Sequence, residues 1–465
     1  MSRSRRWFAA AALAAAVGLA ECVTAQGAGG GAPATAEPWR LDRALAAPDW
    51  LRLDGEIQLR YEAIDSQFRG DPRLDHSDHL VVHRTALRAE ARLEPVSLVA
   101  ELIDARLYGA GFGSVVNDGA SDAVDVLQGY AELRLSDGAA GEHRLRLGRW
   151  TVDLGGRRLV GRNIYRNTIN AFTGVDWEWR GESTGVRAFW SMPVERLPGD
   201  LPSLLDNDVE LDRESLERQF MGVFVDHALT ERSRLEVYAF ALVEGDRLSR
   251  RREIVTPGAR WRLRPAPGAV DAEVEVAWQL GKSRAAIGGP DLDHLACLHH
   301  AAVGYTLDAA WQPRLALAMD YASGDRRPDD GDQNRFDSLF GVPTQDFGPA
   351  GIFGAAGRAN LLSPELRVGL RPSDAVALHA AWRAIWLADE NDAWTTGGVR
   401  DATGAAAAHV GQQLDARLRW QAVPQTLTID VGGAYLSAGG FRERAAPAGR
   451  RGDTVYGYLQ AVLRF

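Results

Sequence analysis

The sequence is almost free of cysteine and lysine. Its 465 residues contain two cysteines, Cys22 and Cys297, and 53 basic residues, of which only Lys282 is a lysine, leaving 53 − 1 = 52 arginines. Cys22 lies in a segment that we expect to be removed on export, so the mature chain can form no intrachain disulfide. An exported protein without a disulfide needs another source of stability, and a closed ladder of β-strands can supply it.

Long hydrophobic runs are also missing. The longest, residues 7–20, has 14 residues, whereas a membrane-spanning helix needs about 20. This run follows three arginines and precedes a small-residue cleavage pattern at residues 23–25, so we predict a signal peptide over residues 1–25. A lipid anchor on Cys22 is not favoured, because Glu21 stands where such a signal needs a small residue.

The net charge is negative, which argues against a nucleic-acid partner. It is −9 for the whole chain, and removal of the signal peptide takes away three arginines and one glutamate, giving −9 − 2 = −11. Arginine can still be concentrated on one internal surface, which a total charge does not reveal.

What the sequence has in abundance is alternation of apolar and polar residues with a period of two. In the last stretch, residues 453–465, Leu459, Ala461, Leu463 and Phe465 share one face and polar residues occupy most of the other. This pattern is typical of a strand with one apolar and one wet face, either in a soluble sandwich or in a membrane barrel. An aromatic residue at the end of such a strand resembles the closing strand of bacterial outer-membrane barrels.

The connections between the alternating segments favour the barrel. We predict eighteen strands, at residues 51–64, 79–94, 96–108, 125–136, 143–154, 172–181, 183–194, 218–229, 234–245, 253–265, 269–283, 293–308, 313–324, 361–372, 376–388, 409–422, 426–438 and 453–465. Long connections alternate with short turns throughout, as in outer-membrane barrels, whereas a sandwich has no reason to keep that order. We therefore predict an all-β fold, an 18-stranded antiparallel transmembrane β-barrel over residues 51–465, preceded by a periplasmic linker over residues 26–50 with a short helical turn.

Three further stretches contain short motifs whose order and spacing along the chain are informative. They are residues 146–176 (RLGRWTVDLGGRRLVGRNIYRNTINAFTGVD), 320–362 (DYASGDRRPDDGDQNRFDSLFGVPTQDFGPAGIFGAAGRANLL) and 409–420 (HVGQQLDARLRW). With Arg-Tyr-Glu at 60–62 and the final Phe465, their order and spacing resemble the alginate export family of outer-membrane barrels. Gln413 departs from the glutamate that the family often has there, and this departure concerns the substrate rather than the fold.

The resemblance implies a monomeric pore that passes an anionic uronate polysaccharide through an arginine-lined lumen. It assigns Arg149 to the lumen, and Arg157, Arg158 and Arg162 fall in the same motif block. From the alternation we place nine more arginines on the lumen face: Arg52, Arg60, Arg84, Arg88, Arg92, Arg146, Arg417, Arg419 and Arg464. Of these we assign Arg60, Arg84, Arg88, Arg146, Arg417 and Arg419 to the substrate path. A guanidinium binds a carboxylate in bidentate fashion and stays charged, so a series of weak arginine sites can hand on a polyanion. The alternative for each arginine is an ion pair with a neighbouring strand that holds the wall together.

Two segments raise specific structural questions. Alternation from Leu147 would aim Arg149 at lipid, so we predict a β-bulge near Gly148 that turns it inward. The long connection 325–360 is expected to be an outer loop or a constriction folded into the lumen, and its predicted pore-loop residues are Asp325, Arg326, Arg335, Phe336 and Arg358.

We predict no catalytic residue, no metal site and no cofactor. The acidic loop 324–332 lacks the spaced ligands of a calcium loop, and nothing fixes the metal-capable side chains of residues 75–79. The expected partners are an anionic polysaccharide, the lipid and lipopolysaccharide of the bacterial outer membrane, and the barrel assembly machinery through Phe465. Two alternatives stay open: a general or small-anion porin, and a surface receptor or adhesin that uses the outer loops.

Overall fold

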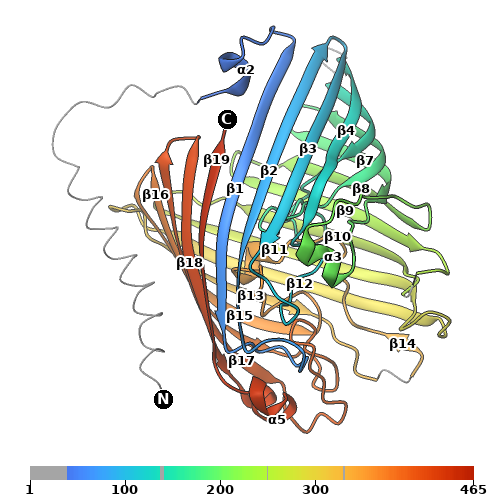
Figure 1. Cartoon of the computed structure of the whole chain (residues 1–465), viewed down its shortest axis with the longest axis vertical. Coiled ribbons are helices and arrows are strands. Elements are labelled where there is room, and N and C mark those ends of the chain that lie inside the picture. Colours follow the sequence, from blue (N-terminus) through green and yellow to red (C-terminus); the bar gives the residue numbers. More distant parts are fainter. Residues whose placement is uncertain (1–38, 137–140, 249, 328–329) are drawn as a thin grey trace.

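The chain forms a closed antiparallel barrel of eighteen strands (Figure 1). The computed structural model describes residues 39–136, 141–248, 250–327 and 330–465. The barrel strands are β1 Leu51–Asp65, β2 Ser77–Leu93, β3 Val96–Tyr108, β4 Asp122–Ser136, β5 Glu142–Trp150, β6 Phe172–Arg180, β7 Thr184–Pro193, β8 Arg218–Ala228, β9 Ser233–Glu244, β10 Glu253–Leu263, β11 Ala269–Ser283, β12 Leu292–Thr306, β13 Arg314–Ala322, β15 Leu361–Ser373, β16 Val376–Trp386, β17 His409–Val423, β18 Leu427–Ala438 and β19 Thr454–Arg464. All eighteen predicted strands are present.

Small elements lie in the connections. The two-residue strand β14, Asp332–Gln333, pairs in parallel with β12. The helices are α2 Leu41–Ala44, α3 Leu201–Asp206, α4 Thr344–Phe347, α5 Gly440–Ala445 and the 3-10 turn η2 Ala448–Arg450. Helix α2 is the helical turn expected before the barrel. Among the described residues, no helix is long and apolar enough to cross a membrane. The predicted signal peptide and the linker residues 26–38 lie outside the described residues.

The barrel closes where β1 meets β19. Gly55 donates its N–H to the Phe465 carbonyl at 2.8 Å, and Phe465 donates back to the Gly55 carbonyl at 3.0 Å. The Phe465 ring covers Gly55, where an added Cβ would lie 2.7 Å from a ring carbon, and it meets the Trp39 ring edge-on at 5.8 Å. The aromatic carboxyl-terminal residue is therefore part of the seam.

Alternation sorts the side chains between the membrane face and the lumen. In β3, Leu98 and Leu102 are 48% and 53% exposed on the outer wall, while Ser97 and Glu101, each next to one of them in sequence, are buried on the inner side. A strand has a period of two, so each apolar residue that faces lipid brings a polar neighbour to the lumen. The same residues that gave the strand prediction thus form the two faces of the wall.

The predicted bulge near Gly148 is wrong. Strand β5 pairs with β4 and with β6 without a register shift, and Gly148 stays opposite its partners in both ladders. Gly148 has φ +130°, and a Cβ there would lie 2.2 Å from the Gly129 carbonyl oxygen, so the glycine allows β4 to approach closely. The register shifts lie one strand earlier, between β3 and β4, after Glu101 and after Ile103.

Candidate functional site

The loop 151–171, between β5 and β6, folds back into the barrel and lies against β1 and β19. The hydroxyl groups of Tyr165 and Tyr456 are 3.0 Å apart, and Arg60 donates from Nη1 to the Tyr165 carbonyl at 2.6 Å. Arg84 also donates to backbone carbonyls of this loop. Two of the arginines predicted to line the lumen therefore bind peptide carbonyls of a loop inside it.

The loop 323–360, between β13 and β15, also lies within the barrel. Ile352 donates its N–H to Glu62 on β1 at 3.0 Å, and Gln413 on β17 donates to the Phe347 carbonyl at 3.0 Å. Phe347 and Ile352 are 3% and 4% exposed. Of the two arrangements that the sequence left open for this connection, the structure has the one in which it is folded inward.

A buried carboxylate, Asp346 of α4, holds the two inner loops together. Its oxygens meet the Arg158 Nε at 3.0 Å and the Arg358 guanidinium, and Arg383 on β16 donates to the Asp346 carbonyl at 2.7 Å. Arg158 also reaches Glu275 on β11 at 2.6 Å. We call Asp346 with Arg158 and Arg358 the Asp346 cluster. It ties loop 323–360 to loop 151–171 and both of them to the wall.

The outer part of loop 323–360 is held by the neighbouring loop 387–408. The contacts are the ion pairs Arg326–Asp389 at 3.0 Å and Arg335 Nε–Asp392 at 2.8 Å, and the Asp325 N–H to Asp392 at 2.9 Å. Phe336 is 2% exposed and belongs to the apolar core. With Arg358 in the Asp346 cluster, all five predicted pore-loop residues make contacts in the structure, although the Arg326 side chain stays 75% exposed.

Most arginines predicted for the substrate path are ion-paired. The pairs are Arg60–Glu62, Arg84–Glu56, Arg88–Glu90, Arg146–Asp176, Arg158–Glu275, Arg162–Glu101 and Arg419–Asp430, at 2.6–3.7 Å. Arg157 lies in loop 151–171, where its carbonyl accepts the Val342 N–H at 2.8 Å. Arg417 differs: it is exposed, and its side chain has no ion pair or hydrogen bond within the described ranges. The charge of this face is thus largely compensated.

Arg149 lies at the end of β5 next to the long loops. It pairs with Glu214 of the loop 207–217 at 2.8 Å and with Asp125 of β4 at 3.1 Å. Its side chain is 14% exposed. The structure thus places this arginine between a strand and an outer loop, where two carboxylates compensate its positive charge.

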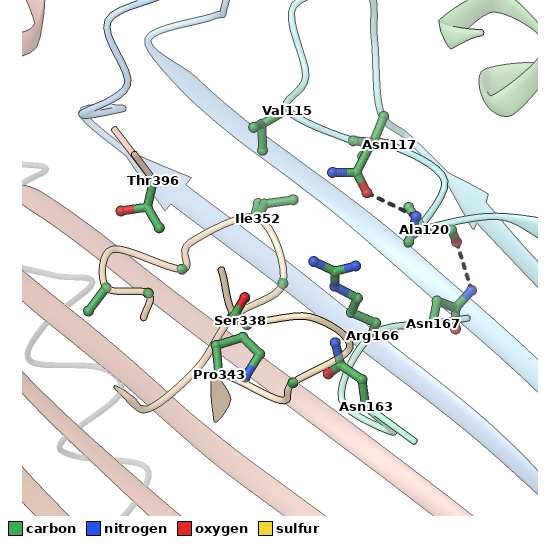
Figure 2. Close-up of a pocket in the computed structure, with 18 of the residues that line it drawn as sticks. Val115, Asn117, Ala120, Asn163, Arg166, Asn167, Ser338, Pro343, Ile352 and Thr396 are labelled. Atoms are coloured by element: carbon green, nitrogen blue, oxygen red, sulfur yellow. Dashed lines mark hydrogen bonds between the residues drawn. The ribbon is translucent and has the colours of Figure 1, made fainter. Parts of the chain in front are cut away.

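At the long-loop end of the barrel, the inner loops enclose a cavity of about 530 Å³ (Figure 2). Its lining comes from connections far apart in the sequence, including Asn117, Arg166, Ser338, Ile352 and Thr396. Figure 2 shows the Arg166 side chain extending from its loop into this space. The residues are held in place by the loop backbone, as when Asn167 donates to the Ala120 carbonyl at 2.9 Å.

The cavity carries positive charge that carboxylates do not balance. The Arg166 side chain has no hydrogen bond or ion pair in the described part of the chain. Burial, together with nearby Arg196, lowers its pKa, and the charge of Asp118 opposes this shift only in part. Arg69 donates to the Ile352 carbonyl at 2.8 Å and has no carboxylate partner among the described residues, and burial lowers its pKa to about 10. Glu62, the one acidic side chain that the described ranges contribute to the lining, is already paired with Arg60 at 2.7 Å. Such a cavity attracts anions.

Sequence reasoning did not select Arg69 or Arg166, the two arginines whose charge no carboxylate balances in this cavity within the described part of the chain. Arg166 lies inside the motif block 146–176, so a signal was present, but its neighbours Arg157, Arg158 and Arg162 carried the same signal. Only the folded loops distinguish a guanidinium with carboxylate partners from one without.

Comparisons with known proteins agree with this architecture. The family model described as alginate export matches residues 49–454. Solved structures with the same fold include three from Pseudomonas aeruginosa, each with a TM-score of 0.58 and covering 89% of this chain and 98% of their own: OpdK with vanillate at 13% identity, OpdL at 11% and OccK9 (OpdG) at 15%. No curated protein matches the sequence. The barrel is an integral outer-membrane protein.

Proposed function

Because this chain belongs to the alginate export family, we propose that it is an outer-membrane pore, rather than an enzyme, for an anionic polysaccharide or oligosaccharide of the uronate type. The observation that carries the proposal is the uncompensated charge of Arg166 and Arg69 in the outer cavity. A uronate presents one carboxylate per sugar, and a guanidinium without a protein partner can bind it by charge-assisted hydrogen bonds. The pore acts as a monomer, and assembly of the barrel uses Phe465.

Arg417 supports a path rather than a single site. It lies on β17 two residues beyond Asp415, towards the short turn that follows this strand. The Asp346 cluster therefore stands between an uncompensated cation in the outer cavity and another in the wall. Weak sites on both sides of a constriction allow a carboxylate to be passed from one to the next.

A small-anion porin is the second candidate, and the packing of the lumen favours it. Two loops fill space that a polymer would need, and a cavity of about 530 Å³ suits a small ligand. OpdK, which has the same fold, was solved with vanillate. On this reading the arginines attract small carboxylates and the inner loops stay in place.

Conductance in planar lipid bilayers separates the two candidates. Uronate oligomers of increasing length are added at millimolar concentration, with neutral oligosaccharides of equal length as the control. The proposal predicts that block by the uronates strengthens with chain length and that the neutral sugars have no effect. Block by monomers and oligomers alike favours the small-anion porin, and a folded barrel without conductance would favour a receptor or adhesin.

A further inference from the structure

A group of buried carboxylates lies at the end of β4, outside the outer cavity. One oxygen from each of Asp122, Asp125 and Asp212 lies within 4.8 Å of the others. Asp122 and Asp125 are 3% and 5% exposed, and Asp212 comes from the loop 207–217. We propose that these three carboxylates form a binding site for a divalent cation of the calcium class.

Asp122 shows which oxygen is open. Its Oδ1 is buried and has no hydrogen-bond partner in the described part of the chain. Asp125, in contrast, already has a donor on each oxygen: its Oδ1 accepts from Arg149 at 3.1 Å and its Oδ2 accepts the Asp212 N–H at 2.5 Å, which leaves lone pairs for a cation. A buried carboxylate oxygen without a donor is costly unless a cation or a proton meets it. Asp122 therefore brings a buried oxygen without a donor to a group that also contains Asp125 and Asp212.

The charged groups around Asp122 do not balance its carboxylate, so that its Oδ1 stays available to a cation. Three carboxylates lie together here, those of Asp122, Asp125 and Asp212, and two guanidinium groups, those of Arg149 and Arg196, lie near them. Arg149 pairs with Asp125 and Glu214, and Arg196 pairs with Asp118, so neither forms an ion pair with Asp122 or Asp212. Carboxylates crowded in this way are ligands for a hard divalent ion.

A second group of metal-capable side chains, with similar spacing, already has its negative charge balanced by arginines. His300, Asp320 and Asp346 also place ligand atoms within 4.8 Å, but Arg158 and Arg358 supply the positive charge at Asp346. Among the described residues, no arginine forms an ion pair with Asp122, although Arg196 and Arg149 lie near it. Calcium suits the β4 site better than magnesium does, because calcium accepts irregular oxygen geometry and can complete its shell with water.

The bound cation would fix an outer loop to the barrel. Strand β3 already holds the start of this loop, since Asn207 accepts the Leu107 N–H at 2.8 Å and donates to the Leu107 carbonyl at 2.8 Å. The Asp212 N–H already ties the loop to Asp125 of β4, and a cation bound by the Asp212 side chain would strengthen this second anchor. The loop segment between Asn207 and Asp212 would then be held more firmly at both ends.

The test is calorimetric titration of calcium chloride into the full-length protein in detergent after chelator treatment. We expect one saturable site with a Kd on the order of 10⁻⁴ to 10⁻³ M, as in extracellular calcium modules, weakened at least about tenfold in Asp122→Asn and Asp212→Asn. Asp332→Asn, which changes an exposed outer-loop carboxylate, should bind as the wild type does. Equal affinity of all three variants, or no saturable binding by the wild type below about 10 mM calcium, would overturn the proposal.

Limited trypsin digestion adds a readout that does not depend on the heat of binding. The Arg213 side chain is 64% exposed, and calcium should slow cleavage after it severalfold while cleavage after Arg400, in the loop 387–408, stays the same. Asp212 is in a loop, so Asp212→Asn carries the test if Asp122→Asn does not fold. Cleavage after Arg213 at the same rate with and without calcium in the wild type counts against the site.

Discussion

The packing of loop 323–360 predicts the effect of one substitution, Asp346→Asn. Asparagine keeps the shape of the side chain and removes the charge that faces Arg158 and Arg358. Breaking a buried ion pair by changing one partner costs about 3–5 kcal/mol. Arg158 keeps Glu273 and Glu275, so the loss falls mainly on Arg358, and we take the lower end of that range. About 3 kcal/mol shifts the balance between the packed and the released loop on the order of a hundredfold.

Single-channel recording in planar bilayers measures this shift. The folded Asp346→Asn barrel should visit a higher-conductance level far more often than the wild type, because the released loop leaves more of the lumen to water. Asp332→Asn is the matched control, since it removes an exposed carboxylate from β14 of the same loop. If Asp346→Asn folds and keeps the wild-type conductance, the Asp346 cluster does not hold a constriction.

Three other substitutions test the site and the wall. Arg166→Gln should weaken block by uronate oligomers about tenfold, the effect of losing a charge-assisted hydrogen bond, while Arg326→Gln should leave the block unchanged. Gly148→Ala should lower the free energy of unfolding in denaturant by about 1–3 kcal/mol, since φ at this position is +130°. Gly369→Ala is the control and should be neutral, because an added Cβ would have no heavy atom within 4 Å. Equal stability of the two variants would contradict this account. Phe465→Ala should lower the yield of folded barrel in vivo, and an unchanged yield would show that the seam does not need the ring.

The fold could be predicted because its signal is local. Alternation with a period of two can be recognised in each strand separately. The order of long and short connections can then be followed along the sequence from one strand to the next. Strand ends were also predictable to within a few residues, since turn residues mark them. The prediction for Gly148 failed because a close approach between two backbones and an inserted residue both select glycine, and only the partner strand distinguishes them.

The site was less predictable because it is built by loops that meet across the barrel. The sequence marks many arginines on the lumen face, but it does not show which of them find a carboxylate. Arg158 forms an ion pair with Asp346, which lies 188 residues away in the sequence. The side chain of Arg166, eight positions after Arg158, has no ion-pair partner in the described part of the chain. Asp122 and Asp212 are likewise distant in sequence and become neighbours only when an outer loop packs on β4.

The zero-current potential of the wild-type pore across a potassium chloride gradient tests the central claim most directly. Uncompensated guanidinium groups on both sides of the Asp346 cluster should make the pore prefer chloride to potassium, and the preference should fall when Arg166 and Arg417 are both changed to glutamine. A pore that prefers potassium, or a preference that the double substitution leaves unchanged, would contradict a lumen built for anions.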